Sequence, residues 1–101
     1  MKYKVVIQPE AENDIKEAFS WYESKRDGLG HDLLLQIEAA FYFLETNPEV
    51  FQKDYEGVRK HIIKRFPYKI VYVLEKNRIV VIAVLHHRRN PTVLKQRRDN
   101  M

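Results

Sequence analysis

The sequence predicts an α+β domain in which a helical hairpin covers one face of a largely antiparallel four-stranded sheet. Two observations predict this fold. Two long segments with helical periodicity follow each other across a short Gly28-Leu29-Gly30 connection, and three β-branched runs then fill the C-terminal half. A chain of 101 residues has room for one hydrophobic core, so residues 1–101 are expected to form a single domain in the order β-α-α-β-β-β.

The first strand is expected at Tyr3–Ile7, a short β-branched run that Pro9 stops. Pro9 is suited to the first turn of the helix that follows, because its φ is fixed at a helical value. The acidic residues that come after it interact favourably with the positive end of the helix dipole. The apolar face of this helix consists of Ala11, Ile15, Ala18, Phe19 and Tyr22. The pattern ends at Asp27-Gly28, which predicts the helix terminus.

The second helix is expected from Gly30 to Asn47-Pro48. Its apolar stripe consists of Leu34, Ile37, Phe41 and Leu44, widened by Leu33, Ala40 and Phe43. Because the connection to the first helix is so short, the two helices should lie antiparallel.

Three strands are expected after a polar loop, at Val58–Phe66, Lys69–Glu75 and Arg78–His87. A tight turn at Lys76-Asn77 joins the last two. The hairpin covers one face of this sheet, and the other face is left to water or to a ligand.

The charge is divided between the two halves of the chain. Residues 1–58 carry 6 Lys/Arg against 12 Asp/Glu, a net charge of −6, whereas residues 59–101 carry 12 against 2, a net charge of +10. The cations alternate with aromatic and β-branched residues, so the positive charge should be displayed on folded strands. Alternation along the second predicted strand places Lys60 and Lys64 on one face and Arg59, His61 and Arg65 on the other. Such a surface requires an anionic partner, such as nucleic acid or an acidic protein.

Several classes of function find no support. There is no cysteine, which excludes disulfides and thiolate chemistry and suits a reducing compartment. The longest apolar run, Ile79–Leu85, is far too short to span a bilayer, so a cytoplasmic protein without membrane contact is predicted. His86 and His87 should point to opposite faces of their strand and cannot share a metal ion without a bulge. Neither a metal nor another cofactor is expected, since glycine-rich phosphate loops and GxSxG elbows are also absent.

One reaction remains possible with the residue types of the basic half. Cleavage of RNA by its own 2′-hydroxyl needs a base, a cation to stabilise the phosphorane, and an acid. Arg65, Arg88 and Arg89 could supply the cation, Lys60 or Lys64 the base, and His86 or His87 the acid. The alternative is a basic face that is solvated or binds a protein. The spacing of these residues leaves both interpretations open.

Aromatic residues admit two interpretations as well. Phe66, Tyr68 and Tyr72 could stack on bases, but Tyr72 shares a strand face with Ile70, and packing in the core is favoured. Trp21 lies off the main stripe of its helix and is suited to cover the edge of the hairpin or to dock a partner.

Taken together, the sequence resembles the RelE/ParE superfamily of toxins from bacterial type II toxin-antitoxin systems, a group that includes plasmid stabilisation proteins. The resemblance covers almost the whole chain, from VVIQPEAENDIKEAFSWY to IVVIAVLHHRRNP. Its most specific parts are Arg59 with the downstream Phe66-Pro67-Tyr68 and Ile70-Val71-Tyr72, and the H-x-x-R-x-P set. That set consists of His86, Arg89 and Pro91.

The resemblance implies a toxin that arrests growth when free and a cognate antitoxin that neutralises it. RelE-like members cleave mRNA on the ribosome as metal-independent endoribonucleases, whereas ParE-like members inhibit DNA gyrase. The tail after Arg89 has neither tyrosine nor histidine, which disfavours the ribonuclease, whereas Lys60, Lys64, Arg65 and Arg89 favour it. Alternatives are a non-catalytic nucleic-acid-binding module and an inactive protein that only binds its antitoxin.

These considerations give three sets of candidate residues. The candidate catalytic residues are Arg89, Arg65, Lys64, Lys60 and His86. The residues expected to contact nucleic acid or another target are Arg59, Arg88, Lys95, Arg97 and Arg98. Trp21 and Tyr42, two aromatic residues on the outside of the hairpin, are expected to anchor the antitoxin.

Overall fold

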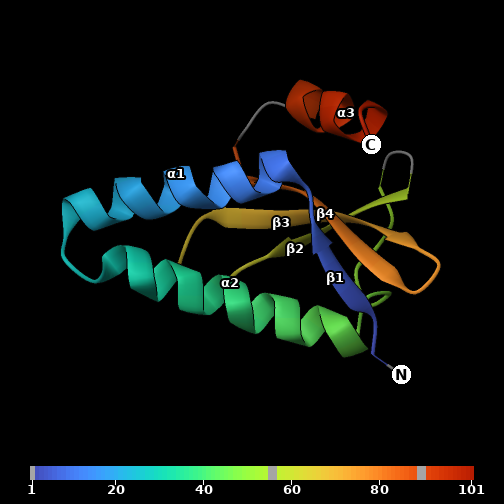
Figure 1. The fold of residues 1–101 in the computed structure, drawn as a ribbon, viewed down its shortest axis with the longest axis horizontal. Coiled ribbons are helices and arrows are strands. Elements are labelled where there is room, and N and C mark those ends of the chain that lie inside the picture. Colours follow the sequence, from blue (N-terminus) through green and yellow to red (C-terminus); the bar gives the residue numbers. More distant parts are fainter. Residues whose placement is uncertain (1, 55–56, 89–90) are drawn as a thin grey trace.

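The computed structural model describes residues 2–54, 57–88 and 91–101, apart from the side chain of Pro91, and confirms the predicted architecture. The elements are β1 (Lys4–Ile7), α1 (Pro9–Lys25), α2 (Leu29–Thr46), β2 (Val58–Ile62), β3 (Tyr68–Glu75), β4 (Arg78–His86) and α3 (Pro91–Asp99). Figure 1 shows α1 and α2 as an antiparallel pair against the sheet, with α3 beside the first turns of α1 and away from α2.

The sheet is mixed, in the order β1-β4-β3-β2. Strands β2, β3 and β4 form two antiparallel pairs, whereas β1 pairs with β4 in parallel, from Lys4 opposite Arg78 to Ile7 opposite Val81. The largely antiparallel sheet is therefore confirmed, with a parallel edge strand. Since β1 ends at Ile7, no strand of the described part of the chain lies beside β4 beyond Val81 on that side.

The main core lies between the hairpin and the sheet. Its buried residues are Ala11, Ala18, Leu33, Ile37, Ala40, Leu44, Ile63, Phe66, Ile70, Tyr72, Ile79, Val81 and Val84. Tyr72 packs in the core, as predicted, where it is fully buried, and its hydroxyl donates to the Pro48 carbonyl at 2.7 Å. Burial raises the pKa of Tyr72 to about 12, against an opposing effect of Arg59, so the phenol stays protonated and donates this bond.

The connection between α1 and α2 depends on two glycines and one carboxylate. Gly28 has a φ of 89°, a left-handed conformation that glycine adopts without strain. A Cβ on Gly30 would lie 2.6 Å from the Phe19 carbonyl oxygen, so the close approach of the helices requires glycine. Glu23 accepts hydrogen bonds from the Gly28 and Gly30 N–H groups at 2.9 and 2.8 Å, which satisfies the free N-terminus of α2 and lowers the pKa of Glu23.

The second predicted strand is shorter than expected, because β2 ends at Ile62 instead of Phe66. The Ile63 N–H still bonds to the Tyr68 carbonyl at 3.0 Å, but Arg65 then adopts a φ of 71° and the chain reverses. Pro67 has no N–H to continue the ladder. The sequence pattern missed this reversal because Val58–Phe66 is rich in β-branched and aromatic residues throughout.

The sequence analysis expected the sheet face opposite the hairpin to be left to water or a ligand. In the structure, α3 covers part of that face. A second apolar cluster forms there, from Val58, Val71, Val73, Val80, Ile82, Ala83, Leu85 and Leu94, with Val93 beside it. The register of β3 and β4 shifts between Val71 and Tyr72, so that Ile82 and Ala83 both belong to this second cluster. The sequence did not predict α3 because Val93 and Leu94 are too few to form a helical stripe.

A buried ion pair fastens α3 to the rest of the fold. The Arg97 guanidinium donates to both carboxylate oxygens of Asp14 in α1, at 2.8 and 3.1 Å. Arg97 also donates to the Ile82 carbonyl at 3.0 Å, and the Asp14 carboxylate accepts from the Val84 N–H at 3.1 Å. The two side chains thus supply hydrogen bonds to the backbone of Ile82 and Val84, at the edge of β4 beyond the end of β1. The hydrogen bonds to Asp14 raise the pKa of Arg97.

We expect Arg97→Ala to lower the free energy of unfolding by about 3 kcal/mol, because the variant leaves the Asp14 carboxylate buried without its cation. Arg78→Ala is the matched control, since it removes an Arg from the half-exposed pair with Glu75 and should cost less than about 1 kcal/mol. Urea unfolding of both variants measures the difference. Equal losses would show that the Asp14–Arg97 pair does not stabilise the fold.

Candidate functional site

The candidate catalytic residues lie on different surfaces of the domain. Lys60 is on the α3 side of the sheet, two residues from the buried Val58, and pairs with Asp54 at 3.0 Å. Lys64 follows the end of β2 and lies on the α2 side, and Arg65 pairs with Asp32 of α2 at 3.6 Å. The predicted alternation that placed Lys60 and Lys64 on one face is therefore wrong, because the strand ends between them.

His86 lies at a third position. Its ring contacts Tyr68 edge to face and lines a hollow of about 610 Å³ beside Trp21 and Tyr22 of α1. The ring stacks on His87 at 4.7 Å between centroids, so the expectation that the two rings occupy opposite faces is wrong. The reason is that β4 ends at His86, where the alternation of side chains stops.

The tautomer and the pKa of His86 are set by its neighbours. Its Nδ1 accepts the Arg88 N–H at 3.1 Å, so a neutral His86 carries its proton on Nε2. Desolvation and then the nearby His87, Arg88 and Lys69 lower the pKa of His86. This lowers the fraction of imidazolium at neutral pH, which weakens the predicted role of His86 as an acid.

Lys69 is a candidate that the sequence analysis missed. It is only 7% exposed, on the face that it shares with Val71 and Val73, and its Nζ donates to the His87 carbonyl at 3.3 Å. Burial, and then the neighbouring Lys60, lower the pKa of Lys69, whereas Asp54 acts in the opposite direction. The signal in the sequence was the alternate spacing of Lys69, Val71 and Val73, which places the three side chains on one face of a strand.

Two of the residues expected to contact a target are used inside the protein. Arg59 is 8% exposed and donates to the Glu49 carbonyl at 3.1 Å and to the Phe51 carbonyl, which holds the loop before β2. Arg97 belongs to the ion pair described above. Of the others, Arg88 and Lys95 are exposed and Arg98 is partly exposed on α3.

Arg89, the remaining catalytic candidate, lies outside the described residues, so the H-x-x-R-x-P set is described only at His86 and at the backbone of Pro91. In residues 2–54, 57–88 and 91–101 no group of three His, Asp or Glu side chains could hold a metal ion. The described residues also contain no helix that is long and apolar enough to cross a membrane.

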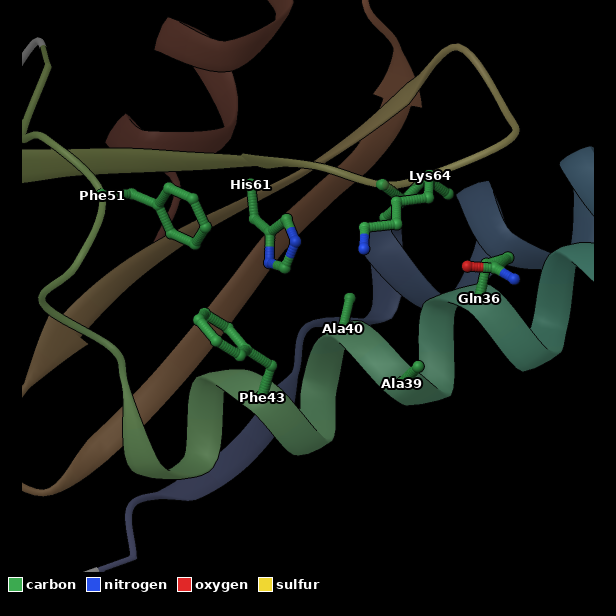
Figure 2. Close-up of a pocket in the computed structure, with 8 residues that line it drawn as sticks. Gln36, Ala39, Ala40, Phe43, Phe51, His61 and Lys64 are labelled. Carbon is green, nitrogen blue, oxygen red and sulfur yellow. The ribbon is translucent and has the colours of Figure 1, made fainter.

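A second hollow, of about 440 Å³, lies between α2 and β2 (Figure 2). We call it the α2–β2 hollow; its lining residues are Gln36, Ala39, Ala40, Phe43, Phe51, His61, Ile63 and Lys64. The His61 ring contacts both Phe51 and Phe43, with ring centroids 4.6 and 5.7 Å away, and the Lys64 side chain extends toward His61. His61 Nδ1 is buried without a hydrogen-bond partner, and burial lowers the pKa of His61.

The two aromatic residues expected to bind an antitoxin are both exposed, but they do not form one patch. Trp21 lies one turn before the end of α1 and has the Lys25 ammonium 4.8 Å from its ring centre. Tyr42 lies more than three turns into α2, with the Lys2 ammonium at 5.7 Å. The two rings are therefore separated by roughly 10 Å or more along the hairpin.

Comparisons with known proteins agree with this fold. The sequence matches the family model described as the ParE toxin of the type II toxin-antitoxin system parDE, over residues 5–91. Among solved structures, the fold matches a chain of the chromosomal ParDE TA system from P. aeruginosa with a TM-score of 0.74 and 13% identity, covering 84% of this chain and 96% of that one. A comparison with curated proteins finds no match.

The buried imidazole of His61 predicts a pH dependence of stability. The folded protein holds a neutral ring with a lowered pKa, whereas the unfolded chain protonates at the ordinary value of 6.5. The contribution of His61 is therefore fully present above pH 6.5 and is lost as the pH falls from there toward the lowered folded pKa. We expect the free energy of unfolding to decrease less between pH 7.5 and pH 5.5 in His61→Phe than in the wild type. The same decrease in both, measured by urea unfolding, would contradict this assignment.

Proposed function

Since this chain belongs to the ParE toxin family of type II toxin-antitoxin systems, we propose that it is the toxin of such a module, that it arrests growth by inhibiting DNA gyrase, and that a cognate antitoxin neutralises it. The resemblance noted above links ParE-like members with gyrase and RelE-like members with mRNA cleavage on the ribosome. The family model that matches residues 5–91 is that of ParE.

The observation that carries the choice of gyrase is the separation of the candidate catalytic residues. RNA cleavage by the 2′-hydroxyl needs its base, its acid and its cation within hydrogen-bond reach of one phosphate. Lys60 and Lys64 lie on opposite sides of the sheet, and Arg65 is held by Asp32. Of the catalytic candidates predicted from the sequence, Lys60, Lys64 and His86 lie at three separate positions, although Lys69 and Arg88 lie near His86. A binding toxin that acts through a surface does not need such convergence.

Ribosome-dependent mRNA cleavage is the second candidate, and Lys69 favours it. A lysine with a lowered pKa, close to Lys60 and to the backbone of His87, is a chemically suitable proton acceptor. Its low exposure disfavours the same role, because a substrate would have to reach an ammonium group that is 7% exposed. The exposed Arg88 directly follows His87, whose carbonyl accepts the hydrogen bond from Lys69, and directly precedes Arg89.

We expect expression of this chain alone to arrest growth, and the purified protein to inhibit supercoiling by gyrase without reducing translation in a cell-free system. A purified topoisomerase I serves as the control for nonspecific binding to DNA, which would be steeply salt-dependent. Cleavage of mRNA in the translation reaction, with supercoiling unchanged, would reverse the assignment. Activity in neither assay would support a protein that only binds its antitoxin.

A variant at Lys69 separates the two candidates more directly. Lys69→Met replaces a buried ammonium by an apolar chain of similar length, so the fold should be retained or stabilised. If the protein inhibits gyrase, we expect the variant to inhibit supercoiling to within about twofold of the wild type. Loss of growth arrest in a stable Lys69→Met protein, measured together with its thermal unfolding, would instead favour catalysis at this lysine.

A further inference from the structure

We propose that a cationic hollow at one end of the sheet binds a small anion with a terminal phosphoryl group, such as a diphosphate or a nucleotide. The hollow has a volume of about 380 Å³ and lies between the loop before β2, the β3–β4 turn and the last turn of α3. We call it the Arg59 hollow; the charged side chains that line it are Glu49, Lys53, Arg59, Lys76 and Arg98.

Arg59 is a buried cation without a counter-ion among the described residues. It is only 8% exposed, its Nε is buried without a hydrogen-bond partner, and no described carboxylate lies within ion-pair distance of its guanidinium. Arg97, the other enclosed arginine, has Asp14 as its partner. Since a buried charge is costly unless it is paired, Arg59 is suited to take an anion from outside the chain.

The unbonded part of Arg59 suits an anion with two neighbouring oxygens. Its Nη1 donates to the Glu49 and Phe51 carbonyls, which leaves Nε and Nη2, on the other edge of the planar group, without an acceptor in the described part of the chain. Two parallel N–H groups of this kind bind phosphate or carboxylate oxygens bidentately. The Arg59 backbone is held between Lys53 and Tyr72, so its position is fixed before a ligand binds.

The backbone of Lys76 is a second, independent indication of a site. Lys76 opens the β3–β4 turn with a φ of 55°, a left-handed conformation that glycine or asparagine adopts more readily. Its exposed side chain lines the Arg59 hollow. A long cationic residue in this conformation indicates that the side chain has a role, and here it adds positive potential to the hollow.

The balance of charge selects the class of ligand. The hollow has four cationic side chains against one described carboxylate, that of Glu49. An anion with two or more charges gains more from this potential than a single carboxylate does. A terminal phosphoryl group carries about two negative charges and offers three acceptor oxygens. A phosphodiester of a nucleic-acid backbone carries one charge and has sugars on both sides, so it is less able to reach the recessed guanidinium.

The test is calorimetric titration of the chain with pyrophosphate at about pH 8, where terminal phosphoryl groups are ionised, with ionic strength matched by chloride. We expect one site per chain. Arg59→Lys keeps the charge but not the bidentate geometry, so it should raise Kd by at least about tenfold. Lys76→Gly removes a charge and suits the positive φ, so Kd should rise about three- to tenfold while the temperature of thermal unfolding does not fall.

The matched control is Lys16→Ala, which removes an exposed lysine that pairs with Glu12 and does not line the hollow. Its Kd should stay within about twofold of the wild type. A wild-type chain that does not bind pyrophosphate at about 10 mM would overturn the proposal, as would an unchanged Kd in Lys76→Gly. An equal loss in Lys16→Ala would also overturn it, because attraction to net charge would then explain the binding. If Arg59→Lys does not fold, Lys76→Gly decides the outcome.

A second titration identifies the source of the phosphate. A DNA duplex with 5′-hydroxyl ends contains phosphodiesters only, and we expect its affinity to change less than about twofold in Lys76→Gly. Duplex binding that requires Arg59 and Lys76, in a chain that does not bind pyrophosphate, would assign the hollow to the nucleic-acid backbone and overturn the terminal phosphoryl group. The supercoiling assay is a separate measurement, so a chain that binds pyrophosphate without inhibiting gyrase would retain this site and lose only the target assignment.

Discussion

The Asp14–Arg97 ion pair is the interaction on which the arrangement of the three layers depends. It satisfies two backbone groups of β4, the Ile82 carbonyl and the Val84 N–H, at the point where β1 no longer reaches. Both are positions where an unpaired polar group would be costly in the interior. Because Asp14 comes from α1 and Arg97 from α3, the same hydrogen bonds join both sides of the sheet at one edge.

This arrangement determines which cations remain available to a partner. Arg97 and Arg59 each donate hydrogen bonds to backbone carbonyls, so part of the charge of the basic half stabilises the fold itself. The apolar cluster beneath α3 occupies a face that the charge pattern had suggested was open. Lys69 is enclosed at the margin of this cluster and loses basicity through burial. A net charge of +10 in the C-terminal half therefore overstates the cationic surface that the folded protein offers.

The apolar residues of the helical hairpin are likewise divided, into a buried set and an exposed set. The faces of α1 and α2 that meet the sheet form the core, whereas the outer face of α2 leaves Leu35, Tyr42 and part of Phe43 in solvent. An isolated toxin would carry this apolar surface at some risk to its solubility. A partner that covers it would stabilise the folded state by mass action, since it binds the native protein and not the unfolded chain.

The sequence by itself determined the hairpin and the order of the elements, since helical periodicity, Pro9 and the glycines around Leu29 act locally. It also placed Tyr72 correctly in the core, because a strand face alternates with a fixed period. The end of β2, the helix α3 and the pairing of His86 with His87 were decided by tertiary structure. For α3, a contact distant in sequence, Asp14 with Arg97 across the sheet edge, overrides a weak local pattern. The surroundings of Lys60, Lys64 and Lys69 were also decided by tertiary structure. They depend on where β2 ends and on which face of the sheet α3 covers. The spacing of the cations in the sequence encodes neither.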